Sequence, residues 1–170
     1  CVAGIEFQDL EGQPACKSAA CEAGTYGSST DTTAEPECTD CPAGTYSSAT
    51  GLTSETQCNN CPLGRWLGGT GASDVDTCTK CVAGRYGDAN GATSIDVCKP
   101  CAEGIEYQEL EGQPACKSAA CEAGKYGSSR DTTAEPACTD CPVGTYGSAT
   151  GLTSEAQCNA CPIGRYSTTT

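Results

Sequence analysis

The sequence predicts a small disulfide-rich repeat protein, an elongated rod of irregular two-stranded β-hairpin units with little or no helix and no globular core. Three observations lead to this prediction. Seventeen cysteines occur in 170 residues, and their spacing recurs every 20 residues along the chain. Each 20-residue repeat also carries one glycine and one aromatic residue at nearly constant places after its first cysteine. A constant period near 20 is typical of repeat proteins, in which each repeat mainly contacts its neighbours.

A longer period of five repeats is also present. Residues 101–170 are identical to residues 1–70 at 54 of 70 positions, and the segment EGQPACKSAACEAG recurs intact from Glu11 and from Glu111. We therefore expect a first super-repeat over residues 1–100 and a second, truncated one over residues 101–170, in a segment of a longer polypeptide. The predicted repeats are residues 1–20, 21–40, 41–60, 61–80 and 81–100, followed by 101–120, 121–140, 141–160 and 161–170.

The glycine and a central turn predict the shape of one repeat. Glycine occupies the fourth place every time: Gly4, Gly24, Gly44, Gly64, Gly84, Gly104, Gly124, Gly144 and Gly164. A place that admits only glycine indicates positive φ or close backbone approach. Mid-repeat turn signals such as Thr50-Gly51 and Asn90-Gly91 should reverse the chain between two short extended arms. A lone two-stranded hairpin is marginal in water, so we expect its ends to be clamped.

One aromatic residue follows the glycine in each repeat. These residues are Phe7, Tyr26, Tyr46, Trp66, Tyr86, Tyr107, Tyr126, Tyr146 and Tyr166. Because the ring is the only large apolar group of a repeat, we expect it to pack on the disulfide and on the adjoining repeat, in a ladder. The alternative is a stripe of exposed rings that binds a glycan or a partner.

Composition indicates an extracellular or cell-surface location. The net charge of −13, with no histidine, would repel nucleic acid and anionic lipid, so we expect neither as a partner. A 20-residue repeat cannot bury enough apolar surface to offset its ordering entropy, and one cysteine in ten residues indicates disulfides formed in an oxidising compartment. No apolar run approaches the roughly 18 residues of a spanning helix, so we expect no membrane insertion in this segment.

The cysteine spacing allows several pairings. The segment from Cys38 to Cys61 has the spacing of a four-cysteine zinc site. Each zinc site would take the cysteines of two neighbouring repeat boundaries. A super-repeat has five boundaries, an odd number, so the grouping would shift from one super-repeat to the next. Near-identical sequences in the two super-repeats would then need different partners. Two disulfide schemes avoid this conflict: each C-x-x-C closes on itself, or each repeat does. The second clamps the hairpin, should add roughly 3 kcal/mol per loop, and is favoured here. Zinc, local pairing and a redox role remain alternatives.

The favoured scheme pairs Cys1 with Cys16, Cys21 with Cys38, Cys41 with Cys58, Cys61 with Cys78, Cys81 with Cys98, Cys101 with Cys116, Cys121 with Cys138, and Cys141 with Cys158, and it leaves Cys161 unpaired.

We expect no enzyme, no cofactor and no metal. The chain has no histidine and no GxSxG-type nucleophile motif, so it offers little for acid, base or nucleophilic chemistry. The carboxylate pairs Asp74/Asp76 and Glu35/Glu37 lack the oxygen-rich loop of a tight calcium site and are expected on the solvated surface.

The motif CPxGTYxSATGLTSxxxCxxCPxGRY, present from Cys41 to Trp66 and from Cys141 to Tyr166, resembles the ephrin-receptor-like cysteine-rich repeat, a relative of the tumour-necrosis-factor-receptor and epidermal-growth-factor-like modules. The similarity is close in repeats 2–5 and 7–9 and loose in repeats 1 and 6. It implies a bond from the cysteine before Gly-x-Tyr to the first cysteine of the following C-x-x-C. It also implies a large extracellular or surface protein, since long arrays of this repeat are associated with such proteins.

The recurrence of similar repeats at regular intervals predicts a structural protein, a stiff rod or fibre shaft such as a flagellar hair or cell-surface filament. The alternative is the stalk of a receptor or adhesin that presents a binding domain elsewhere. Other copies of the chain or sister fibre proteins are the expected partners. No asparagine lies in an Asn-x-Ser/Thr sequon, but O-linked glycans are candidates, the alternative being ordinary polar loops. The candidate hydroxyls are Ser28, Ser29, Thr30, Thr32, Thr33, Ser47, Ser48, Thr168, Thr169 and Thr170.

Overall fold

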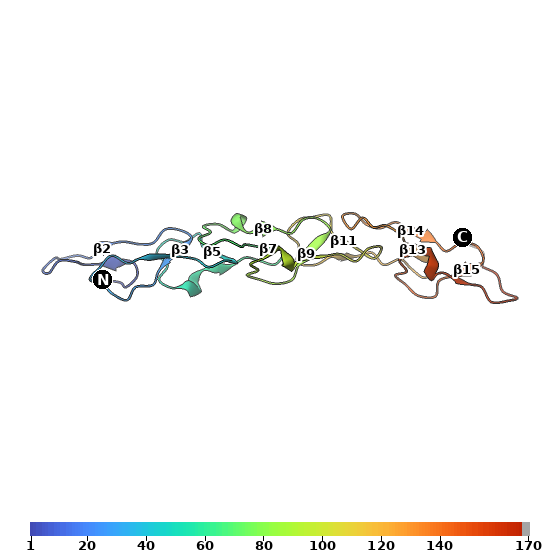
Figure 1. The fold of residues 1–170 in the computed structure, drawn as a ribbon, viewed down its shortest axis with the longest axis horizontal. Helices are drawn as coiled ribbons and strands as arrows, with labels where there is room; N and C mark the ends of the chain where they lie inside the picture. The colour runs from blue at the N-terminus through green and yellow to red at the C-terminus, as the bar shows by residue number, and fades with distance from the viewer. Residues whose placement is uncertain (168–170) are drawn as a thin grey trace. The chain divides into compact units, whose positions relative to one another are not determined.

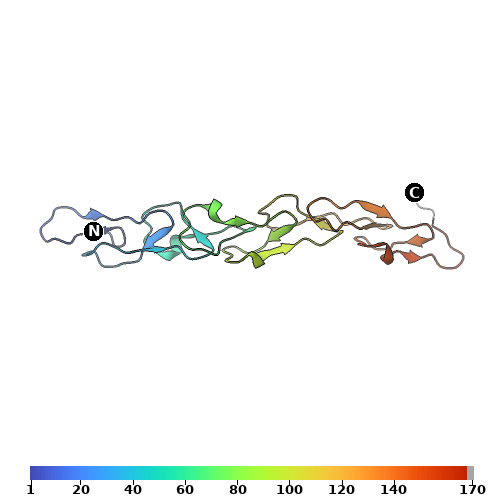
Figure 2. The ribbon, with the colours of Figure 1, turned by 45° about the horizontal axis from the view of Figure 1, so that its top comes forward.

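A computed structural model describes residues 1–167. In this range the chain forms eight two-stranded antiparallel hairpins and no α-helix (Figure 1 and Figure 2). The hairpins are β1 (Glu6–Phe7) with β2 (Lys17–Ser18), β3 (Thr25–Gly27) with β4 (Cys38–Asp40), β5 (Thr45–Tyr46) with β6 (Asn59–Asn60), β7 (Arg65–Trp66) with β8 (Thr79–Lys80), β9 (Arg85–Gly87) with β10 (Cys98–Pro100), β11 (Glu106–Tyr107) with β12 (Lys117–Ser118), β13 (Lys125–Gly127) with β14 (Cys138–Asp140), and β15 (Thr145–Tyr146) with β16 (Asn159–Ala160). The predicted fold of one irregular hairpin per repeat is confirmed.

Each hairpin pairs the strand after the conserved glycine with the strand at the end of the same repeat. In repeat 2, Tyr26 lies opposite Thr39 and Gly27 lies opposite Cys38. The long loop between the two strands carries a short 3₁₀ turn in four repeats: η1 (Glu55–Gln57), η2 (Val75–Thr77), η3 (Ile95–Val97) and η4 (Glu155–Gln157). Each turn lies just before the second cysteine and brings it back towards the first.

The buried interior consists mainly of cysteine. The first cysteine of repeats 2–8 is at most 3% exposed, and Leu52, Ala72 and Leu152 are the other buried apolar side chains at loop positions. No globular core forms in the described residues, because each repeat buries little more than its disulfide. The half-buried aromatic rings border this interior and do not fill it.

The chain forms two compact regions. One holds Cys1–Lys80 with Ala89–Val97, and the other holds Cys81–Asp88 with the residues from Cys98 onward. The five-repeat period is a property of the sequence, and super-repeats over residues 1–100 and 101–170 stay a prediction.

Backbone hydrogen bonds join consecutive repeats within each compact region. In the first region the N–H groups of Gly51, Gly71 and Gly91 donate to carbonyl oxygens of the preceding repeat, at Cys21 (2.7 Å), Cys41 (2.9 Å) and Cys61 (2.8 Å) respectively. In the second region Gly151 donates to Cys121 at 2.7 Å. The predicted mid-repeat turn therefore reaches back to the previous repeat as well as reversing the chain.

Candidate functional site

The eight hairpins found in residues 1–167 are each closed by a disulfide. The bonds are Cys1–Cys16, Cys21–Cys38, Cys41–Cys58, Cys61–Cys78, Cys81–Cys98, Cys101–Cys116, Cys121–Cys138 and Cys141–Cys158. These are the pairs of the scheme in which each repeat closes on itself. Cys161 has a free thiol among the residues described.

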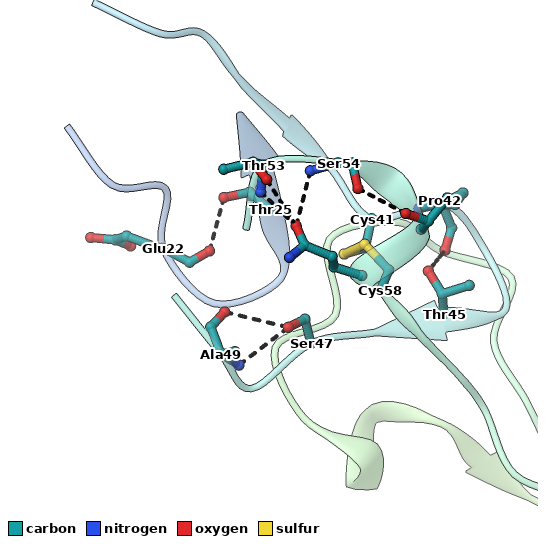
Figure 3. The surroundings of a disulfide bond; sticks show 12 residues. Glu22, Thr25, Cys41, Pro42, Thr45, Ser47, Ala49, Thr53, Ser54 and Cys58 are labelled. Atoms are coloured by element: carbon teal, nitrogen blue, oxygen red, sulfur yellow. Dashed lines mark hydrogen bonds between the residues drawn. A yellow bond between two sulfur atoms is a disulfide. The ribbon is translucent and has the colours of Figure 1, made fainter. Parts of the chain in front are cut away.

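Short-range hydrogen bonds hold the loop around the Cys41–Cys58 disulfide of repeat 3 (Figure 3). The Thr45 hydroxyl donates to the Pro42 carbonyl at 2.7 Å, beside Cys41. The side-chain oxygen of Gln57 accepts the N–H groups of Thr53 at 2.7 Å and Ser54 at 3.1 Å. The Gln57 bonds order the segment that precedes Cys58. The disulfide alone closes a loop of 17 residues and would not fix the conformation of this segment.

The conserved glycine forms the junction between repeats. Gly24 has φ +88°, and a Cβ atom there would overlap the carbonyl oxygen of Gly71, two repeats further on. The equivalent Gly44 meets Gly91 in the same way. Both reasons expected for an invariant glycine, positive φ and close backbone approach, are confirmed. Contacts with the second-next repeat go beyond the neighbour-only contacts that the 20-residue period predicts.

Residues 27–78, which contain three of these disulfide-closed loops in whole or part, match the family described as tyrosine-protein kinase ephrin type A/B receptor-like. Residues 27–78 are therefore similar to an ephrin-receptor-like cysteine-rich domain. The match confirms, for these residues, the resemblance seen in the cysteine and glycine spacing. A search of curated proteins finds no match to the chain.

Ephrin-receptor-like disulfide-rich domains are extracellular, and cysteine-rich repeats of this kind are typical of non-catalytic modules. Within the described residues, no helix is long and apolar enough to cross a bilayer. In the same range, no group of three or more histidine, cysteine, aspartate or glutamate side chains is placed to hold a metal ion.

The aromatic rings of the repeats lie at the junctions, but they are only partly covered. The backbone of Tyr26 forms a parallel bridge with Leu52 of the next repeat, and the same bridge joins Tyr126 to Leu152. Tyr146 and Tyr166 are 42% and 86% exposed, so the expected packing does not extend to these two rings. They belong to the last repeats of residues 1–167, and no following loop in that range covers them.

Two rings are covered by cations. The Nζ atom of Lys17 lies 5.3 Å from the centre of the Phe7 ring, and Lys117 lies 5.6 Å from that of Tyr107. In both hairpins the lysine is the cross-strand partner of the ring. Sequence reasoning missed these pairs, although the ten-residue offset recurs in both super-repeats.

The candidate glycosylation hydroxyls differ in accessibility. Ser47 is 1% exposed, and its hydroxyl lies between the N–H and carbonyl groups of Ala49. An O-glycan on Ser47 therefore does not fit the folded repeat, which corrects that prediction. Ser28, Thr30, Thr33 and Ser48 are exposed, whereas Ser29 and Thr32 are half-buried. Thr168, Thr169 and Thr170 lie outside the described residues.

Several carboxylates have structural partners. Asp31 accepts hydrogen bonds from the hydroxyl and N–H of Thr33, which lower its pKa, and Asp131 is held by Thr133 in the same way. The Lys99 ammonium lowers the pKa of Asp88 by hydrogen bonding. All of these groups are exposed, so their bonds order loops on a solvated surface.

The first carboxylate pair has a structural role. Asp74 caps η2 by accepting the Asp76 N–H at 2.7 Å, and Asp76 pairs with Arg65 at 3.2 Å. Sequence reasoning placed both carboxylates on the surface but missed the cap, for which an Asp-x-Asp segment before a cysteine is the available signal. Glu35 and Glu37 are exposed.

Proposed function

We propose that this ephrin-receptor-like domain is a structural segment of an extracellular or cell-surface protein, and that it acts as a stiff shaft of a fibre or filament. The observation that carries the proposal is the recurrence of the same inter-repeat bond at 20-residue steps, from Gly51 to Cys21, from Gly71 to Cys41 and from Gly91 to Cys61. Identical bonds at identical intervals suit a spacer or a lattice, because each of these repeats joins the preceding one in the same way.

The contacts around each junction support stiffness. One disulfide closes each repeat, so a repeat cannot lengthen by unfolding its loop. The glycine of one repeat contacts both of the next two in the first compact region, as Gly24 does through Ser47 (2.8 Å) and Gly71. A bend at one junction would therefore disturb two sets of contacts.

A receptor or adhesin stalk is the second candidate. Its support is the matched family, whose description names receptors of the tyrosine-protein kinase class. In this case the repeats hold a binding domain away from the cell surface.

The fibre-shaft function implies partners for the chain. Other copies of the chain or sister fibre proteins would associate with the shaft, and the exposed hydroxyls of Ser28, Thr30, Thr33 and Ser48 are the acceptable sites for O-linked glycans. Intact-mass measurement of native material tests the glycans: added hexose masses support them, and the bare polypeptide mass contradicts them.

Electron microscopy of native material distinguishes the two functions. Ordered filaments that bind antibodies against residues 1–170 support the fibre shaft, and isolated rods joined to a globular head support the stalk. Scattering from the purified chain adds a common test: a profile typical of a flexible coil would contradict both, since both need stiffness.

A further inference from the structure

Three consecutive repeats of the second compact region form a polar cleft. The cleft has a volume of about 450 Å³, and its lining includes Glu103, Tyr126, Ser128, Arg130, Ser154 and Glu155. This volume lies within the roughly 300–1,000 Å³ range of small-molecule sites, although most such sites are more apolar. The lining residues come from repeats 6, 7 and 8, so no single repeat could form it.

Glycine contacts bring the three walls together. A Cβ atom on Gly104 would overlap the carbonyl oxygen of Gly127, and the Gly127 N–H donates to the Leu152 carbonyl at 2.8 Å. The neighbours of these three residues in the sequence are Glu103, Ser128 and Thr153, which all line the cleft. The backbone junctions thus fix the positions of the three segments that carry the lining side chains.

The first super-repeat has the same junctions but different side chains. Gly4 and Gly27 approach as closely, and Gly27 donates to Leu52 at 2.8 Å. The residues that match Glu103 and Arg130 are Ala3 and Thr30, so the second copy gains one negative and one positive group at this place. Residues 1–60 and 101–160 differ at only 11 positions, and these two both line the cleft.

A third difference releases a hydroxyl group in the cleft. In the first super-repeat the hydroxyls of Ser54 and Thr56 hydrogen-bond at 2.8 Å. Alanine replaces the threonine at position 156, so Ser154 loses this partner. The Ser154 oxygen still caps η4 by accepting from the Gln157 backbone, and its hydroxyl hydrogen is available to a ligand. The second copy therefore differs from the first by three changes that together add donors and acceptors to one place.

The chemistry of the lining selects the ligand. Arg130 supplies several N–H donors and has no ion pair within residues 1–167, while Glu103 and Glu155 supply acceptors. Tyr126 offers a half-buried ring with a polar end, which suits a ligand with both apolar and hydroxylated faces. The chain carries a net charge of −13, which opposes anionic ligands.

We propose that this cleft binds a neutral oligosaccharide, with the sugar against Tyr126 and its hydroxyl groups bonded by Arg130, Glu103, Glu155 and Ser154. The proposal is independent of the structural function, because a fibre shaft and a stalk could each carry such a site. It assigns binding to the second super-repeat and not to the first.

The test is a titration of the ¹⁵N-labelled chain with maltose, cellobiose and lactose, followed by amide chemical shifts. Shifts are expected at Ser128–Arg130 and Thr153–Glu155, with none at the matching residues 28–30 and 53–55. The R130T variant takes the residue of the first copy, so it should fold, and it should bind roughly tenfold more weakly through loss of a charge-assisted hydrogen bond. The triple variant A3E/T30R/T56A should create a second site in the first copy.

Three results would overturn the proposal: no shift with any of the sugars at millimolar concentration, equal shifts in both copies of the wild-type chain, or unchanged binding by R130T. Glucuronic acid serves as the charged control. Tighter binding of this acid than of the neutral sugars would also contradict the proposed ligand class.

Discussion

The carbonyl oxygen of Gly71 occupies the space that a Cβ atom on Gly24 would need, although the two residues belong to different repeats. This contact joins repeat 2 to repeat 4. At Gly124, the matching place in the second super-repeat, a Cβ atom would meet no described atom within 4 Å. The backbone conformations agree closely, with φ of +88° at Gly24 and +87° at Gly124. The two positions therefore separate the effect of backbone conformation from that of close packing.

We expect G24A to destabilise the fold more than G124A. Alanine at positive φ costs about 1–2 kcal/mol at either position, and only G24A also has to displace the Gly71 backbone, which adds about 1–3 kcal/mol. Denaturant unfolding of both variants measures the difference. Equal losses would show that the junction with repeat 4 contributes nothing.

Removal of the disulfide in repeat 3 should loosen its loop. The double variant C41S/C58S loses a clamp across 17 residues, which costs roughly 3 kcal/mol. Limited proteolysis should then cut between Ser47 and Gln57. The control is C1S/C16S, whose cysteines are exposed and whose loss removes a similar loop constraint with less packing. Faster proteolysis of C1S/C16S than of C41S/C58S would contradict the importance of the buried Cys41.

Thiol titration distinguishes the disulfide frame from zinc coordination. The denatured but unreduced chain should react at one thiol, that of Cys161, because the other sixteen cysteines are paired. After reduction all 17 cysteines should react. Several reactive thiols accompanied by stoichiometric zinc would instead support the four-cysteine zinc alternative.

Leu52 is expected to be the most sensitive leucine of the first compact region. It is 7% exposed, and L52A should cost about 2–4 kcal/mol by leaving a cavity beside Tyr26. The chain should still fold, because Ala72 occupies the matching place in repeat 4. Leu10 is 57% exposed, so L10A is the control and should change the free energy of unfolding by less than about 0.5 kcal/mol. Denaturant unfolding measures both, and equal losses would contradict the packing role of Leu52.

Acid should weaken the loops held by Asp31 and Asp131. Both carboxyls have a pKa lowered by Thr33 or Thr133, so their stabilising effect is complete above the unfolded-state value of about 3.9 and is lost as the pH falls through the lower folded-state pKa. The free energy of unfolding should therefore fall between about pH 5 and pH 2 by more in the wild type than in the double variant T33A/T133A. An identical pH dependence in both proteins would exclude this contribution.

The predictions from sequence succeeded where they concerned residues of one repeat. The paired strands and the positive φ of the conserved glycine follow from spacing of at most 20 residues. Ser47 is the instructive failure: it begins the polar, turn-forming segment that follows Tyr46, yet it is buried. Its N–H donates to the Ala72 carbonyl of the next repeat at 2.9 Å, a contact that no local pattern indicates.

The repeat length, the single hairpin of each repeat and the glycine after its first cysteine could be read from the amino-acid sequence, because all three depend on residues close together in the chain. The contacts between repeats became visible only in the folded chain: Gly24 against Gly71, Leu52 beside Tyr26, and the three-repeat cleft around Arg130. These contacts depend on backbone hydrogen bonds between repeats, such as that from Gly51 to Cys21, whose partners lie more than 20 residues apart. Cysteine spacing within a repeat carries no record of them.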